Sequence, residues 1–290
     1  MTRLEAAIVN TLCYADIFKY PLTAREIHRY LISRRPTPSS SFASGLSVLL
    51  KVHLTQKNRG FYFLPGRKVI VSRRLSLRRV NHEKYTRALH LTSWLKFVPT
   101  VKAIFLTGAL AMNNSDRNDD IDLMIITRTG YLWSTRLIVT TILDLFNVRR
   151  RPHQSEVSDK VCLNLWLDEN YLQLPRAMQN LYTAHEVAQA KVLWDRGEIA
   201  NRFLWANRWI LKYLPNTPLP SPTPSLYPIP YTLYPNFFES LAYHFQRRYM
   251  KSRQTRETIT SHSAFFHPKD TTAWVMREYH QRVSQYLSNS

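Results

Sequence analysis

The stretch VKAIFLTGALAMNNSDRNDDIDLMIIT, residues 101–127, consists of two apolar runs separated by a polar loop. The first run ends at Gly108, and the second begins with Asp120-Ile121-Asp122. Because side chains alternate between the two faces of a strand, Asp120 and Asp122 are predicted to project from the same face. Two carboxylates held this close repel each other unless a cation lies between them. Oxygen ligands of this kind suit Mg²⁺, which proteins bind through one or two carboxylates together with substrate phosphates.

Gly108 stands at the end of the first predicted strand. Because glycine has no Cβ, the backbone there can approach a phosphate closely. The glycine turn and the two aspartates together predict half of a site for a metal ion and a nucleotide.

This pattern resembles the nucleotidyltransferase superfamily of the DNA polymerase β type, most closely its small prokaryotic members. The family signature is a glycine followed by Gly or Ser, a spacer, and then Asp-x-Asp on a strand. Here Gly108 and Ala109, a ten-residue spacer and Asp120-Ile121-Asp122 fill these places, and the match covers residues 103–126. The usual Ser or Gly is replaced by Ala109, which has a backbone N–H but no hydroxyl.

The resemblance implies functions for the matching residues. Asp120 and Asp122 would hold Mg²⁺ or Mn²⁺, while Thr107, Gly108 and Ala109 would hold the phosphates of an NTP. It also implies a third carboxylate in the middle of a neighbouring strand, which normally completes the metal site and takes the proton of the attacking hydroxyl.

The expected neighbouring strand is residues 161–167, and Asn164 stands where that carboxylate is expected. We therefore count Asn164 among the catalytic positions, although an amide is no base and a weaker metal ligand. Asp168 could replace it only if the strand bends.

Two hypotheses about function remain open. In one, the protein transfers an NMP from an NTP to a hydroxyl of a nucleic acid, a protein or a small molecule and releases pyrophosphate, with Asp168, a substrate group or a water molecule in the third role. The charge favours nucleic acid, RNA or DNA, as the acceptor. In the other, it binds a nucleotide as a sensor or nucleic-acid-binding regulator without chemistry.

The net charge of +20 is concentrated near the amino terminus, where residues 1–90 contain 17 Lys and Arg but four Asp and Glu. Such an excess favours a polyanionic partner through neutralisation of phosphates. A generally basic proteome or a solubility device is the alternative. An anionic membrane is a weaker one, because no strongly apolar helix face accompanies the charge.

The same region predicts three helices, at residues 4–17, 24–31 and 39–50, followed by a hairpin around Asn58-Arg59-Gly60. Thr23 and Glu26 form a capping-box pattern for the second helix. This order resembles a winged helix-turn-helix domain, which binds DNA or docks on proteins. The third helix has no Lys or Arg before Lys51, so the sequence does not indicate base recognition. The candidate nucleic-acid-binding residues are Lys57, Arg59, Arg73, Arg74, Arg78 and Arg79.

We therefore expect an α+β protein with four parts: a winged helix-turn-helix-like domain at 1–80, a polymerase-β-like mixed sheet with helices at 81–214, a Pro-rich connector at 215–235, and a helical tail at 236–290. Residues 181–196 and 201–214 are predicted to be helical. The connector is a possible ligand for a protein partner. No stretch predicts a transmembrane segment or signal peptide, and the two distant cysteines, Cys13 and Cys162, show no metal-ligand spacing. A reducing, cytoplasmic setting is expected.

Overall fold

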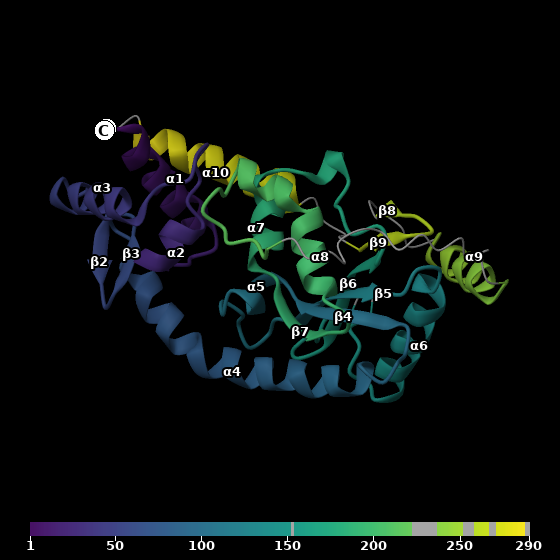
Figure 1. Ribbon diagram of the computed structural model, residues 1–290. Coiled ribbons are helices and arrows are strands. Elements are labelled where there is room, and N and C mark those ends of the chain that lie inside the picture. Colours follow the sequence, from purple (N-terminus) through teal and green to yellow (C-terminus); the bar gives the residue numbers. More distant parts are fainter. Residues whose placement is uncertain (152–153, 222–236, 252–257, 267–270, 288–290) are drawn as a thin grey trace.

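The computed structural model describes residues 1–151, 154–221, 237–251, 258–266 and 271–287 (Figure 1). It contains a six-stranded mixed sheet, a small three-stranded antiparallel sheet and helices around both, which confirms the predicted mixed α and β class. In these described ranges, no helix combines the length and apolar character needed to span a membrane. The predicted Pro-rich connector lies largely outside the described residues.

The amino-terminal part alternates helices with short strands. Its elements are α1 (Arg3–Ile17), β1 (Leu22–Thr23), α2 (Ala24–Arg29), α3 (Ser39–Lys51), β2 (Gln56–Asn58) and β3 (Phe61–Phe63). The predicted capping box is confirmed, since the Thr23 side chain and Glu26 bond each other's backbone N–H groups. The predicted hairpin is also confirmed, with Arg59 and Gly60 both at positive φ. The three strands pair in the order β1-β3-β2.

The larger sheet has the strand order β7-β4-β5-β6-β9-β8. Its strands are β4 (Val101–Leu106), β5 (Ile121–Thr127), β6 (Val161–Asp168), β7 (Lys191–Asp195), β8 (Thr258–Ile259) and β9 (Ser263–Phe265). The strand β5 runs antiparallel to β4 and parallel to β6. The strands predicted at β4, β5 and β6 are therefore confirmed.

The predicted helix over residues 181–196 is wrong in its second half. The helix α7 (Leu181–Gln189) ends before Ala190, and Lys191–Asp195 forms β7 instead. This segment pairs antiparallel with β4 and satisfies backbone groups that would otherwise lie at the sheet edge. The predicted helix over 201–214 is also shorter, because α8 (Ile199–Ala206) is followed by a 3₁₀ turn (Arg208–Lys212).

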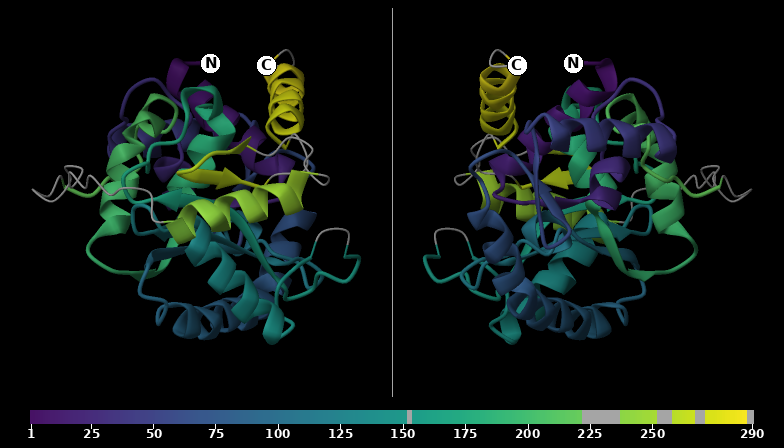
Figure 2. Two further views of the ribbon diagram at one scale, coloured as in Figure 1. Left: turned by 90° about the vertical axis from the view of Figure 1, so that its right-hand side faces the viewer. Right: turned by 90° about the vertical axis from the view of Figure 1, so that its left-hand side faces the viewer.

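Helices cover both faces of the larger sheet (Figures 1 and 2). The long α4 (Val69–Leu95) and α6 (Leu132–Leu145) pack on the face that buries Ile121, Leu123 and Ile125. The helices α7, α8 and α10 (Thr271–Leu287) lie on the opposite face with Met124. The helix α9 (Phe237–Lys251) packs against α6.

The amino-terminal part and the larger sheet share one hydrophobic core. This core joins Ile8 of α1 and Leu46 of α3 to Phe105 and Met124 of the sheet. The helix α10 runs along α1, so the carboxyl-terminal helix packs back on the body (Figure 1). The domain boundary expected at residues 80 and 81 lies within the continuous helix α4.

Candidate functional site

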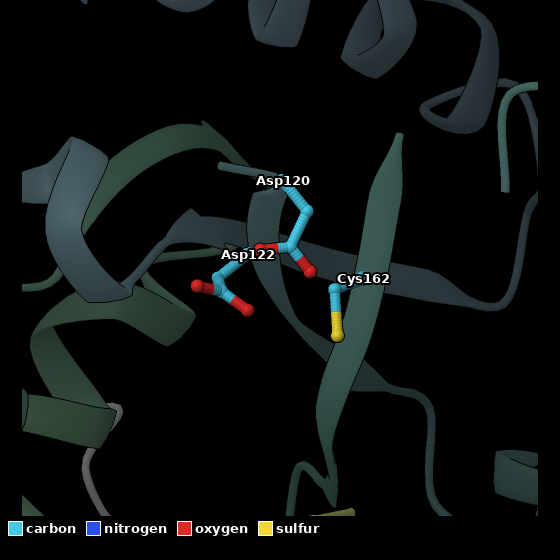
Figure 3. Close-up of side chains that lie close together, drawn as sticks. All are labelled: Asp120, Asp122 and Cys162. Carbon is cyan, nitrogen blue, oxygen red and sulfur yellow. The ribbon is translucent and has the colours of Figure 1, made fainter. Parts of the chain in front are cut away.

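The side chains of Asp120, Asp122 and Cys162 converge between the strands β5 and β6 (Figure 3). Asp120 directly precedes β5, Asp122 is its second residue, and Cys162 lies opposite Asp122 in the parallel register. One potential ligand atom from each residue lies within 4.8 Å of the others. The two aspartates therefore project together, as their spacing predicts. The sequence analysis missed Cys162, although it shares the strand parity of Asn164.

The backbone at Gly108 passes close to the Asp122 side chain. Its φ is +63°, and a Cβ added to it would lie 2.4 Å from the Asp122 Oδ2. The adjacent Thr107 N–H donates a 3.0 Å hydrogen bond to the Asp122 carbonyl oxygen. Both the positive φ and the close approach require glycine, so the sequence signal at Gly108 has a local structural cause.

Asn164 lies beside Asp122, where a bulge interrupts the register of β5 and β6. Its Nδ2 donates a 3.1 Å hydrogen bond to the Asp122 Oδ1. Its Oδ1 is buried and has no hydrogen-bond partner among the described residues, and the same holds for the Thr107 hydroxyl. Such atoms are rare in folded proteins and indicate a group that a ligand or water satisfies.

Asp168 does not supply the third carboxylate. It lies opposite Thr127, far along β6 from Cys162, because the bulge shifts the strand parity before Asp168 is reached. Its carboxylate accepts hydrogen bonds from the Thr129 hydroxyl at 2.9 Å and the Gly130 N–H at 3.1 Å. These bonds make Asp168 a turn-capping residue.

Burial and the neighbouring Asp120 raise the pKa of Asp122 to about 7. The Arg150 guanidinium pairs with Asp120, with Nη1 2.6 Å from the Asp120 Oδ2. Burial also raises the pKa of Cys162, which therefore remains a thiol. A thiol is a poor partner for Mg²⁺, so the donor set fits one hard cation held by two carboxylates.

One cavity borders Asp122, and a second borders its hydrogen-bond partner Asn164. The tyrosine chamber, about 280 Å³, is bordered by Gly108, Ala109 and Asp122 and by aromatic side chains of the amino-terminal part and α7. Its tyrosines are Tyr14, Tyr20, Tyr30 and Tyr182. The threonine chamber, about 300 Å³, lies on the side of β6 and is bordered by Asn164. Its threonines are Thr107, Thr183, Thr258, Thr271 and Thr272.

Glu186 of α7 borders both chambers. Burial raises the pKa of its carboxyl group to about 7. A partly buried carboxyl beside two cavities and near a second carboxylate is a recognised feature of functional sites. The sequence analysis placed Glu186 only within a predicted helix, because nothing in its local pattern distinguishes it from a surface acid.

The predicted nucleic-acid-binding residues fall into two groups. Lys57 and Arg59 at the hairpin and Arg78 and Arg79 on α4 are exposed. The other two side chains are engaged within the protein. Arg73 contacts Asn114 and Asp116 at 2.6 Å each, and Arg74 pairs with Glu26 at 2.7 Å.

Comparison of the chain with family models, with curated proteins and with solved structures found no match.

Proposed function

We propose that this protein transfers a nucleoside monophosphate from an NTP to a hydroxyl acceptor and releases pyrophosphate. The observation that carries the proposal is the close approach of the Gly108 backbone to Asp122, beside Asp120 and at the edge of the tyrosine chamber. The strand arrangement supports it, because β4 with its glycine turn, β5 with the acids and β6 are neighbours.

The residues divide into three roles. Asp120 and Asp122 would hold Mg²⁺ or Mn²⁺, which when bound neutralises phosphate charge and polarises the reacting phosphoryl group. The backbone N–H groups of Gly108 and Ala109 would hold the β- and γ-phosphates. Arg150, already beside Asp120, is placed to pair with a phosphate oxygen.

Glu186 is our candidate for the proton acceptor that replaces the missing third carboxylate. Its carboxyl group borders the threonine chamber together with Asn164. Asn164 cannot accept a proton, and Asp168 is engaged in a turn. A general base whose pKa lies near neutrality is well matched to proton transfer at physiological pH.

The test is a transfer assay with each α-³²P-labelled NTP, Mg²⁺ or Mn²⁺, and pooled cellular RNA, protein and small molecules. We expect label on an acceptor with the wild type and a loss of at least about 100-fold in the Asp120→Ala/Asp122→Ala variant, since removing the charge stabilisation costs several kcal/mol. Asp116→Asn, at an exposed aspartate, is the matched control. Equal transfer by the double variant would refute the proposal.

A second candidate function is nucleotide binding without transfer, in a nucleic-acid-binding regulator. Asn164 in the third position and the Arg150 pair with Asp120 favour it. The order of helices and strands in residues 1–63 supports a winged-helix module, with Lys57, Arg59, Arg78 and Arg79 as exposed phosphate contacts. Binding of Mg·NTP without transfer to any acceptor would favour this function.

A further inference from the structure

The strand order gives the two chambers different positions relative to the reacting phosphorus. The glycine turn follows β4, the aspartates belong to β5, and Asn164 is on β6, so the acids lie between the other two. In phosphoryl transfer the attacking and leaving oxygens are roughly in line. With pyrophosphate leaving on the Gly108 side, the acceptor hydroxyl must approach from the Asn164 side. This step rests on the proposed nucleotidyl transfer.

The threonine chamber borders Asn164 on that side as well as Thr107, and its lining is mostly apolar. Met124, Leu165, Leu174 and Phe265 form much of the wall. The lining residues that the structure describes include no Lys, Arg or His. A single-stranded nucleic acid needs a positively charged groove along its backbone, and the described part of this lining does not provide one. The volume of about 300 Å³ is at the lower end of ordinary small-molecule sites.

The polar groups of the chamber include hydrogen-bond acceptors as well as threonine hydroxyls, which both donate and accept. The buried Asn164 Oδ1 has no partner among the described residues, and the Glu186 carboxyl borders the same space. The Thr107 hydroxyl is likewise buried without a partner there. More than nine-tenths of Asn164 and of Thr107 is buried, so leaving these atoms unsatisfied is costly. A ligand that supplies an O–H donor within an apolar body would satisfy them.

We propose that the threonine chamber is the acceptor site and that the acceptor is a small, uncharged, largely apolar alcohol or phenol. Its hydroxyl oxygen forms a bond to the α-phosphorus, the bond from that phosphorus to the β-phosphate oxygen breaks, and the electron pair leaves with pyrophosphate. The hydroxyl proton passes to Glu186. The product is a nucleoside monophosphate joined to the alcohol through a phosphodiester.

The first experiment compares acceptors in the transfer assay with the full chain. Phenol, benzyl alcohol and cyclohexanol are the small probes, while an RNA oligonucleotide and a serine-containing peptide are the polymer probes. We expect at least tenfold more label on a small probe than on either polymer. Label on the polymers but not on the alcohols would overturn the acceptor assignment and leave the proposed function intact. If no acceptor is labelled and water does not hydrolyse the NTP to NMP either, both the acceptor assignment and the proposed function are refuted.

A pair of variants then tests which chamber holds the acceptor and which holds the nucleotide. Ala190→Leu narrows the threonine chamber, and Ala15→Leu narrows the tyrosine chamber. We expect Ala190→Leu to lower transfer to the alcohols at least tenfold with unchanged Mg·NTP affinity, and Ala15→Leu to weaken Mg·NTP binding. Leu165→Phe serves as a second narrowing variant if Ala190→Leu does not fold.

A binding measurement gives a readout that does not depend on catalysis. Phenol alone should raise the melting temperature of the wild type and have a smaller effect on the narrowed variants. Unchanged alcohol transfer and an unchanged response to phenol in folded Ala190→Leu would contradict the assignment.

Discussion

Asn164 has two contrasting amide atoms at the site. Its Nδ2 donates a hydrogen bond to the Asp122 carboxylate, while its Oδ1 is unsatisfied among the described residues. An aspartate at this position would lose the donor and place a third acidic group beside Asp122. Without a metal ion, these carboxylates would repel one another, whereas a divalent cation would bind all of them. The residue therefore determines how strongly the site depends on a cation.

We predict that Asn164→Asp lowers the free energy of unfolding by about 2–4 kcal/mol in EDTA, because a hydrogen bond to a buried charge is replaced by repulsion. Mn²⁺ or Mg²⁺ should restore most of this loss by binding the native state. Thermal unfolding with and without metal measures the effect. Asn164→Leu is the control, because it loses the same hydrogen bond without gaining a ligand. An equal metal response in both variants would contradict the prediction.

At the residue scale, the sequence predicts those parts of the site that depend on the spacing of neighbouring residues. The separation of Asp120 and Asp122 places them on one strand face, and Gly108 marks the turn. Cys162 and Glu186 join the site through the strand register and the packing of α7, which no local pattern encodes. The exclusion of Asp168 depends on a bulge in β6, and a strict alternation of strand faces does not predict it.

At the scale of elements, the capped helix α2, the hairpin and α10 follow from capping residues, turn residues and apolar periodicity. The strand β7 does not, because Lys191–Asp195 contains residues acceptable in either conformation and its pairing with β4 is a long-range interaction. The core shared by the amino-terminal part and the sheet is equally non-local. Several basic residues of α4 form contacts within the protein where the amino-terminal part meets the sheet. The number of basic residues in the sequence therefore overstates the positively charged surface available to a partner.

Arg74 of α4 is the clearest example of such a junction. It makes two hydrogen bonds to Glu26 of α2, at 2.7 and 2.8 Å, and lies 4.1 Å over the Tyr20 ring. Both partners are largely buried, so we predict that Arg74→Ala lowers the free energy of unfolding by about 3 kcal/mol. The matched control is Arg79→Ala, whose exposed pair with Glu83 should contribute little to stability. Urea denaturation measures both, and similar losses in the two variants would contradict the prediction.

At the scale of the whole molecule, His185 of α7 lies where the amino-terminal part meets the helices over the sheet. Its ring stacks on Tyr14 of α1 at 3.9 Å, Tyr30 lies 5.9 Å away, and its Nδ1 contacts Gln189. Its Nε2 has no partner in the described part of the chain. Burial lowers the pKa of His185 from 6.5 to about 3, so the native protein holds it neutral in mildly acidic solution.

The unfolded chain binds a proton at His185 near pH 6.5, whereas the native protein binds it only near pH 3. This residue therefore contributes a loss of stability as the pH falls from 6.5 towards 3, at about 1.4 kcal/mol per pH unit. The raised pKa values of Asp122 and Glu186 act in the opposite direction, so the contribution of His185 must be isolated by a variant. Between pH 7 and pH 5, the wild type should lose about 2 kcal/mol relative to His185→Phe, as measured by denaturation at each pH. A constant difference between the two proteins would show that His185 is accessible to protons in the native state, and that the junction around Tyr14 opens without unfolding.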